Sequence, residues 1–344
     1  MRKKYFRATL LSVLILSLLV IAGCGDTAKS GDNDGNNENA ERTLKITHIG
    51  SDDHVLNLTS KKFKEEVEKN TNGRIKVEIY PRMQLGGEAD MMEQMKNGSL
   101  DMAQITVATL SSRSESFNAW LMPYAVDGLE VAYEMTNSEI GKDILNSLPE
   151  GEGVVPLGYS MIPPRHISSP QEITKMSDFK GMKIRISPAQ AIGDFYKALG
   201  AVPTAMEQQE IYNALQTGVI DGMDSDLESV IVNRFFEISE NLNLTRHHHW
   251  TMGVLFSEKI WSELSDGDQE IVQEAVDAAS TFSYEYTLES ENKFKGELEE
   301  KGVKIVEFQE MDEIRKVAEQ VHEKYSSNPL IAEFIKIAKD NAGE

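Results

Sequence analysis

The segment RIKVEIYPRMQLGGEADMMEQMKNGSLDMAQITVAT, residues 74–109, carries the alternation that decides the fold. Polar and apolar side chains alternate over 74–80, which predicts a strand with one buried face. A helix is expected over 88–97, with its end at Gly98, and the apolar run 102–109 predicts a second strand. Strands that alternate with helices in this way are typical of a largely parallel sheet covered by helices.

The same alternation extends towards the N-terminus. The stretch LKITHI at 44–49 predicts a strand, and 56–70 predicts a helix whose Leu56, Phe63 and Val67 face inward. The resulting β-α-β-α-β order predicts one α/β domain.

This order recurs further along the chain, as strand, helix, strand, helix and strand over 183–186, 188–199, 202–206, 207–217 and 219–223. The stretches QMKNGSLDMA (94–103) and ALQTGVIDGM (214–223) also place Gly and Asp at the same spacing. We therefore expect two similar α/β lobes with a cleft between them.

A single long helix is predicted over 265–301, where no proline occurs. Ser265 and Asp268 can form a capping box at its start, and Gly302 stands where a helix ends. The side chains expected to face inward recur at helical spacing: Ile271, Ala275, Ala279, Phe282 and Tyr286. A helix of about 36 residues is about 54 Å long, which is longer than one lobe is wide, so we expect it to cross both lobes.

The N-terminal residues have the pattern of an export signal. Basic side chains at positions 2, 3, 4 and 7 precede an apolar run over 8–22, which is short for a membrane span. The sequence Ile-Ala-Gly-Cys at 21–24 fits a lipoprotein signal peptidase site. We expect residues 1–23 to be removed and Cys24, the only cysteine, to carry a lipid that anchors the protein to a membrane. The alternative is an incidental thiol inside a removed peptide.

Residues 24–42 are expected to form a flexible tether, because Gly, Asn, Asp and Ser are frequent in 25–41 and bulky apolar side chains are absent there. The whole chain has a formal net charge of −21, which becomes −25 once the four basic residues of 1–23 are removed. This acidity argues against nucleic acid and anionic lipid headgroups as partners. An anionic ligand would need a dedicated patch of arginine.

Three motifs in this order resemble the substrate-binding proteins of TRAP (tripartite ATP-independent) transporters, the DctP family. They are YPRMQLGGEADMMEQMKNGSLDMA (80–103), MSDFKGMKIRIS (176–187) and LGAVPTAMEQQEIYNALQTGVIDGMD (199–224). The likeness runs from about Leu44 to the last helices. It implies a two-lobed, periplasmic-binding-protein-like α/β fold that closes around a small organic acid and delivers it to a separate TRAP permease in the membrane.

The resemblance also implies the domain limits, and the export signal implies the location. Domain I is expected at 43–162 plus 251–290, and domain II at 163–250 plus 291–340. The protein is expected to be a monomer without a cofactor, held outside the cytoplasm by its lipid, in the periplasm or at a Gram-positive surface.

Two arginines are expected to hold the ligand. In the family, an arginine at the end of the K-I-R strand forms a bidentate salt bridge with the ligand carboxylate, and here that residue is Arg185. Strand alternation agrees, because Ile184 and Ile186 share one face and Arg185 points away from it. Arg165, in PPRHISS, matches a second pocket arginine that contacts the other polar end of the ligand. The alternative for both is an ordinary surface arginine.

Further candidates for the same pocket are Glu88, His54, Gln208, Asp224 and Ser225. Glu88 is expected to receive ligand hydroxyls or water, and His54 lies in a loop where the family lines its pocket; both are equally ordinary as solvated residues. Many family members carry an aromatic residue at Gln208 and an asparagine near Ser225, so this pocket is more polar. That difference favours a hydroxylated acid, such as a sugar acid, and leaves a C4-dicarboxylate as the alternative.

The run His247, His248 and His249 suggests a metal site, but we expect none. Neighbours on a strand point to opposite faces, so of the three only His247 and His249 could converge, and no Cys or acidic residue lies near them in the sequence at metal spacing.

Catalysis is not expected, because the sequence contains no P-loop, G-x-S-x-G or H-E-x-x-H motif. Two other functions stay open: a sensor that passes the same signal to a membrane kinase, and an exported lipoprotein hydrolase. For the hydrolase, Ser160, Ser187 and Ser225 have no obvious His partner. The sequence does not distinguish transport from sensing, nor does it identify the acid.

Overall fold

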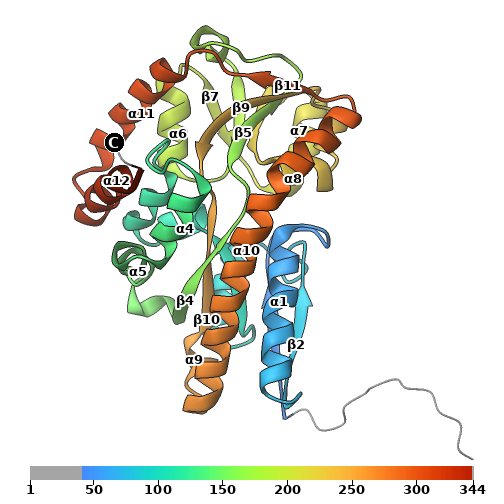
Figure 1. Ribbon diagram of the computed structural model, residues 1–344, viewed down its shortest axis with the longest axis vertical. Coiled ribbons are helices and arrows are strands. Elements are labelled where there is room, and N and C mark those ends of the chain that lie inside the picture. The colour runs from blue at the N-terminus through green and yellow to red at the C-terminus, as the bar shows by residue number, and fades with distance from the viewer. Residues whose placement is uncertain (1–40, 343–344) are drawn as a thin grey trace, which may run out of the picture. The chain divides into compact units, whose positions relative to one another are not determined.

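Two β-sheets organise the part of the protein that the structure describes, residues 41–342 of a computed structural model (Figure 1). The predicted signal peptide, Cys24 and nearly all of the predicted tether lie outside these residues. Within them, no helix is long and apolar enough to cross a membrane. Strands and helices alternate along most of the chain, so the predicted α/β fold is confirmed.

The first sheet has the strand order β2-β1-β3-β10-β4. Its strands are β1 (Arg42–Thr47), β2 (Ile75–Tyr80), β3 (Met102–Thr106), β4 (Val154–Met161) and β10 (Thr251–Ser257). The first three strands pair in parallel, whereas β10 runs antiparallel to β3 and β4. We call this sheet and the helices on it the first lobe.

The helices of the first lobe are α1 (Val55–Asn70), α2 (Glu88–Asn97), α3 (Val107–Ser111), α4 (Leu129–Asn137), α5 (Glu139–Leu145) and α9 (Glu258–Trp261). Helix α2 ends at Gly98, whose φ of 79° is the left-handed conformation expected of a helix-terminating glycine. The strand predicted over 102–109 is too long. It stops at Thr106, because the side chain of that residue accepts a hydrogen bond from the Thr109 N–H and caps α3.

The second sheet has the order β11-β9-β5-β8-β6-β7. Its strands are β5 (Arg165–Ser169), β6 (Lys183–Ile186), β7 (Val202–Ala205), β8 (Gly222–Ser225), β9 (Asn241–His248) and β11 (Lys304–Glu307). The strand predicted over 219–223 begins later, because the N–H groups of Val219 and Ile220 close the preceding helix by donating to the Ala214 carbonyl. We call this sheet and its helices the second lobe.

Helices α6 (Gln190–Ala198), α7 (Ile211–Gln216), α8 (Leu227–Val232) and α11 (Met311–Tyr325) accompany the second sheet. The helix predicted over 207–217 is shorter than expected, since 208–210 form a 3₁₀ turn. The last helix, α12 (Pro329–Ala342), packs against α4 and α5. Because 41–342 belong to one compact unit, the predicted domain limits stay a prediction.

One helix and several chain crossings join the lobes, the last of them between α11 and α12, which packs on α4 and α5 of the first lobe. The chain passes from the first sheet to the second between β4 and β5, and returns between β9 and β10. Helix α10 (Asp266–Glu300, 35 residues) packs on α1 and β4 and also on α8 and β11, so it spans both lobes as predicted (Figure 1).

The side chains that α10 buries differ from those predicted to face inward. Ala275 and Ala279 are buried, but Ile271, Phe282 and Tyr286 are only half-buried. The second half of the helix instead buries Ser283, Thr287 and Ser290. Ser283 Oγ accepts a hydrogen bond from the Met161 N–H at 3.0 Å, where the chain leaves β4 for the second lobe. A polar side chain is needed there because that backbone N–H is buried.

Candidate ligand-binding site

A cavity lies between the two lobes and encloses about 630 Å³ of empty space, part of it open to solvent. Residues after the carboxyl ends of β1, β3, β6, β7 and β8 surround it, which is where open α/β sheets place their ligands. The lining includes six of the predicted residues: His54, Glu88, Arg165, Arg185, Gln208 and Ser225. Asp224 does not line the cavity and lies behind Arg165.

Arg185 brings to this cavity a positive charge that forms no ion pair among the described residues. Ile184 and Ile186 are buried on one face of β6, and Arg185 projects from the other face, with 5% of its surface exposed. Its Nε and Nη2 donate to the Met206 carbonyl at 3.1 and 2.9 Å, and it forms no ion pair within residues 41–342. Burial and the nearby Arg165 lower the pKa of Arg185 to about 10. The guanidinium is therefore ionised at neutral pH, and no carboxylate among residues 41–342 forms a direct ion pair with it.

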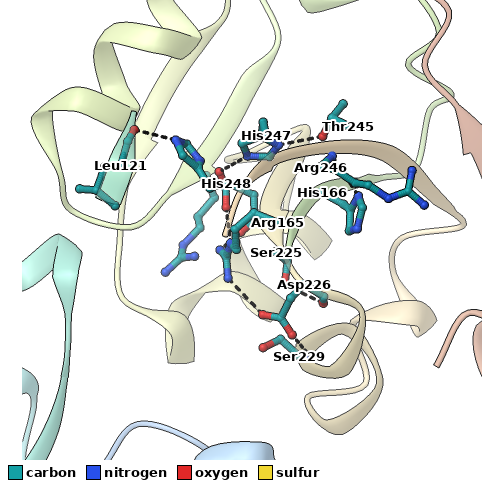
Figure 2. A network of polar contacts seen from close by, with 12 residues as sticks. Leu121, Arg165, His166, Ser225, Asp226, Ser229, Thr245, Arg246, His247 and His248 are labelled. Carbon is teal, nitrogen blue, oxygen red and sulfur yellow. Dashed lines mark hydrogen bonds and ion pairs between the residues drawn. The ribbon is translucent and has the colours of Figure 1, made fainter. Parts of the chain in front are cut away.

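Arg165, at the start of β5, is in a different electrostatic state. Its Nε donates to Asp224 Oδ1 at 2.6 Å. Its Nη1 donates to Asp226 Oδ2 at 3.1 Å (Figure 2). The guanidinium also lies over the Trp250 ring, 4.6 Å from its centroid. Two carboxylates thus neutralise Arg165 and fix the orientation of its guanidinium. Arg165 can therefore donate a hydrogen bond in a fixed direction, but it adds little net positive charge to the cavity.

Asp224 anchors a buried network behind the cavity. Its Oδ2 lies 2.8 Å from His247 Nε2 and 3.0 Å from the Tyr196 hydroxyl. Burial alone would raise the pKa of Asp224, but Arg165 and His247 hold it well below its usual range. This carboxylate therefore stays ionised and acts as the counter-ion of Arg165.

The prediction that only His247 and His249 could converge is wrong, because His247 lies against His248. The pairing of β5 with β9 shifts register between Arg165 and Ile167, and Arg246 on β9 has a φ of 43°. This irregularity puts His247 and His248 side by side, with ring centroids 4.8 Å apart (Figure 2). No acidic residue lies near the histidines at metal spacing in the sequence, but Asp224, 23 positions away from His247, reaches them in space from β8.

Among residues 41–342, two groups of side chains are close enough to hold a metal ion: Asp224 with His247 and His248, and His54 with Asp226 and Glu228. Protein partners already occupy most of the ligand atoms in both groups. His247 uses both ring nitrogens, towards Asp224 and Thr245, and His248 Nε2 donates to the Leu121 carbonyl at 2.7 Å. Hydrogen bonds between protein groups account for these contacts without an ion.

Glu88 and His54 face the cavity from the first lobe. Glu88 Oε1 accepts from the Thr106 N–H at 2.6 Å, and Oε2 accepts from the hydroxyls of Thr106 and Thr109. Burial raises the pKa of Glu88 despite these hydrogen bonds. His54 caps α1, since its Nδ1 accepts from the Leu56 N–H at 3.2 Å. Both side chains have structural partners in addition to their place in the lining.

The sequence reasoning missed several lining residues, among them Thr106, Ser187, Glu207, Asp226, Ser229 and Trp250. Asp226 was within reach of sequence reasoning, because it opens α8 as an N-cap and accepts from the Ser229 N–H at 2.7 Å. An Asp followed by Ser three positions later, shortly after the predicted strand 219–223, is a recognisable cap. Trp250 had no such signal, because its place depends on the return of the chain to the first sheet.

The comparisons with known proteins agree with this architecture. The family described as bacterial extracellular solute-binding protein, family 7 (DctP), matches residues 46–328. The chain belongs to this family. It is therefore an extracytoplasmic solute-binding protein of the TRAP type rather than an enzyme.

Several DctP relatives show what this fold binds elsewhere. A solute-binding protein of Roseobacter denitrificans is 34% identical over 78% of this chain and 82% of its own. Its crystal structure with bound L-galactonate has a TM-score of 0.77 at 33% identity, over 82% of this chain and 93% of that one. A Bradyrhizobium protein in complex with galacturonate has a TM-score of 0.82 at 26% identity, over 87% and 100% of the two chains.

A curated relative with another ligand is the C4-dicarboxylate-binding periplasmic protein DctP of Rhodobacter capsulatus. It is 28% identical over 70% of this chain and 74% of its own. Membership of the DctP family thus fixes the type of protein but not the acid.

Proposed function

We propose that this DctP-family protein captures a small hydroxylated carboxylate, of the sugar-acid type, in the cavity between its lobes and delivers it to a TRAP permease. The observation that carries the proposal is Arg185, a buried guanidinium that lines the cavity and has no counter-ion within residues 41–342. Guanidinium is planar and always charged, so it matches a carboxylate with two parallel hydrogen bonds.

The rest of the lining favours a neutral, hydroxylated ligand body. Glu88, Glu207 and Asp226 bring carboxyl groups to the cavity lining. The charge of Arg165, by contrast, is already balanced by Asp224 and Asp226. A second carboxylate on the ligand would face these acids, while hydroxyl groups can donate to them. We therefore place a sugar acid before a C4-dicarboxylate, in line with the ligands of the Roseobacter and Bradyrhizobium relatives.

The remaining candidates receive supporting roles in this proposal. Arg165, held by Asp224, directs a hydrogen bond to the far end of the ligand, and His54, Gln208, Ser225 and Glu88 contact its hydroxyl groups. We further propose that Cys24 carries a lipid that keeps the protein at the membrane beside its permease. The motif at 21–24 supports this anchoring.

A ligand screen tests the proposal. Purified protein is mixed with aldonates, uronates, oxo acids and dicarboxylates, and its melting temperature is measured; a ligand that binds only the folded state raises it. We expect a shift with a sugar acid that disappears in Arg185→Ala, whose binding should weaken by about 2–5 kcal/mol in calorimetry.

The matched control is Arg113→Ala, which removes an arginine paired with Glu152 outside the cavity lining. It should bind as the wild type does. A melting shift with neutral solutes and none with any acid would contradict the carboxylate assignment.

A further inference from the structure

Helix α1 begins at the cleft with an unusual N-terminus. Its N-cap is His54, and its first turn contains no acidic residue, although acids are favoured there by the helix dipole. The N–H groups of Leu56, Asn57 and Leu58 are satisfied by His54 itself. The first helical residue, Val55, takes its partner from the other lobe.

That partner is Glu228, on α8 of the second lobe. Its Oε1 accepts hydrogen bonds from the Val55 N–H at 2.9 Å and from the Tyr286 hydroxyl at 3.2 Å. Its Oε2 lies 3.7 Å from His54 Nε2 and has no hydrogen-bond partner within residues 41–342. The side chain is fully buried and does not line the cavity. Glu228 therefore joins α8 to α1 across the cleft, and both to the spanning helix α10.

The hydrogen bonds of His54 decide what this cluster can do. Because Nδ1 accepts from the Leu56 N–H, the neutral ring carries its proton on Nε2, which faces Glu228. A metal ion would need the lone pair of that same nitrogen. The cluster of His54, Asp226 and Glu228 is thus suited to an interlobe polar contact and not to a cation.

The electrostatic balance of Glu228 has opposing contributions. Burial raises its pKa, as does the neighbouring Asp226, whereas His54, the Tyr286 hydroxyl and the Val55 N–H favour the carboxylate. When the lobes separate, water can replace these partners on both sides. When the lobes meet without the carboxylate, the Val55 N–H is left buried and unpaired, which is the costly outcome for a backbone donor.

We propose that Glu228 is a positioning residue that latches the second lobe to the N-terminus of α1, and so sets ligand affinity without contacting the ligand. The effect on affinity rests on the proposed function, whereas the latch itself concerns the lobes alone. If only a fraction of the protein is in the closed, binding-competent state, the apparent dissociation constant equals the intrinsic one divided by that fraction. A less populated closed state therefore weakens binding.

The test is Glu228→Ala, with L-galactonate as the probe ligand. We expect about tenfold weaker binding, through faster dissociation. Spin labels on Glu65→Cys (α1) and Gln216→Cys (α7), in a Cys24→Ser background, should report a larger fraction of long interlobe distances. Both label sites are exposed.

The matched control is Glu310→Ala. Glu310 also accepts a hydrogen bond from a distant backbone N–H, that of Met176 at 2.6 Å, but both partners accompany the second sheet. It should leave the interlobe distances unchanged. If Glu228→Ala folds and changes neither the affinity nor the distances, the latch is refuted.

A second variant removes the donor instead of the acceptor. Val55→Pro deletes the N–H at the first helical position, where proline is well tolerated, and the extended His54 (φ −77°, ψ 148°) suits a residue before proline. We expect the same loss, and no further loss when it is combined with Glu228→Ala; additive losses would overturn the proposal.

The spin-label distances measured without ligand distinguish a failure of the proposed function from a failure of the Glu228 latch. If L-galactonate and the other acids do not bind, the proposed function fails while the label distances still test the latch. Unchanged distances in the ligand-free Glu228→Ala protein would refute it on their own.

Discussion

At the scale of single residues, two arginines of one cavity differ in charge balance. Arg165 is held by Asp224 and Asp226, whereas Arg185 is bonded only to a backbone carbonyl among the described residues. Binding of the ligand carboxylate by two parallel hydrogen bonds then depends on Arg185. The ammonium of a lysine, which acts as a point charge, cannot form that pair of hydrogen bonds.

Arg185→Lys should therefore keep the charge and lose the fork. We expect ligand binding to weaken by about 1.5–3 kcal/mol, the value of one hydrogen bond to a charged group, as measured by calorimetry with L-galactonate. Lys183→Arg, an exchange at an exposed position of the same strand, serves as the control and should not change the affinity. Equal binding by wild type and Arg185→Lys would exclude a bidentate contact.

Asp224 makes folding stability depend on pH. Its pKa is held well below the usual range, so its contribution is present above the unfolded pKa of about 3.9 and is lost as the pH falls towards the folded value. Asp224→Asn should lower the free energy of unfolding by about 3–5 kcal/mol at pH 7. In urea titrations this difference should shrink below about pH 4; a difference that does not depend on pH would contradict the role of the charge.

At the scale of elements, two glycines inside helices differ in whether their surroundings leave room for a side chain. A Cβ on Gly141, in α5, would lie 2.1 Å from the Met135 carbonyl oxygen at the end of α4. A Cβ on Gly296, in α10, would meet nothing within 4 Å. The first glycine allows two helices to approach, and the second serves no packing purpose.

Gly141→Ala should consequently lower the melting temperature, because the α4–α5 junction must move to admit a methyl group. Gly296→Ala should stabilise the protein by about 0.5–1 kcal/mol, since alanine loses less backbone entropy in a helix. Thermal unfolding of the two variants beside the wild type measures both effects. Shifts of the same sign would contradict the packing described for α5.

Other elements show where the pattern of the sequence stops being sufficient. The alternation predicted β2, β6 and α2 closely, because each depends on local periodicity and a nearby terminator. The inner face of α10 was not predictable in its second half. One of the side chains buried there, Ser283, accepts a hydrogen bond from the Met161 N–H at the end of β4, 122 positions away in the chain.

At the scale of the whole molecule, the net negative charge of the protein repels the anionic ligand proposed for the site. The chain has a formal net charge of −21, and the proposed ligand is an anion. Long-range repulsion should slow association, and salt should relieve it, because the Debye length falls from about 30 Å at 0.01 M to about 8 Å at 0.15 M.

The association rate constant for L-galactonate should hence rise between these two salt concentrations in stopped-flow measurements. The dissociation rate constant should change less, since the contact with Arg185 is buried and poorly screened. A fall of the association rate with salt would mean that the local field of Arg185 outweighs the net charge.

The sequence by itself determined the repeated α/β order, the length of α10 and the position of Arg185 on a strand facing the cleft. These features follow from periods of two and 3.6 residues, from terminating glycines and from motifs that are local in the chain. It also indicated the right family through the same motifs.

Only the tertiary structure decided which charges are free. Whether Arg165 is neutralised depends on the pairing of β5 with β8, and the convergence of His247 with His248 depends on an irregular pairing of β5 with β9. The contact of Glu228 with Val55 joins residues 173 positions apart in the chain. Sequence periodicity specifies the face on which a side chain lies, but its partner depends on how distant elements pack, and that packing fixes the electrostatics of the site.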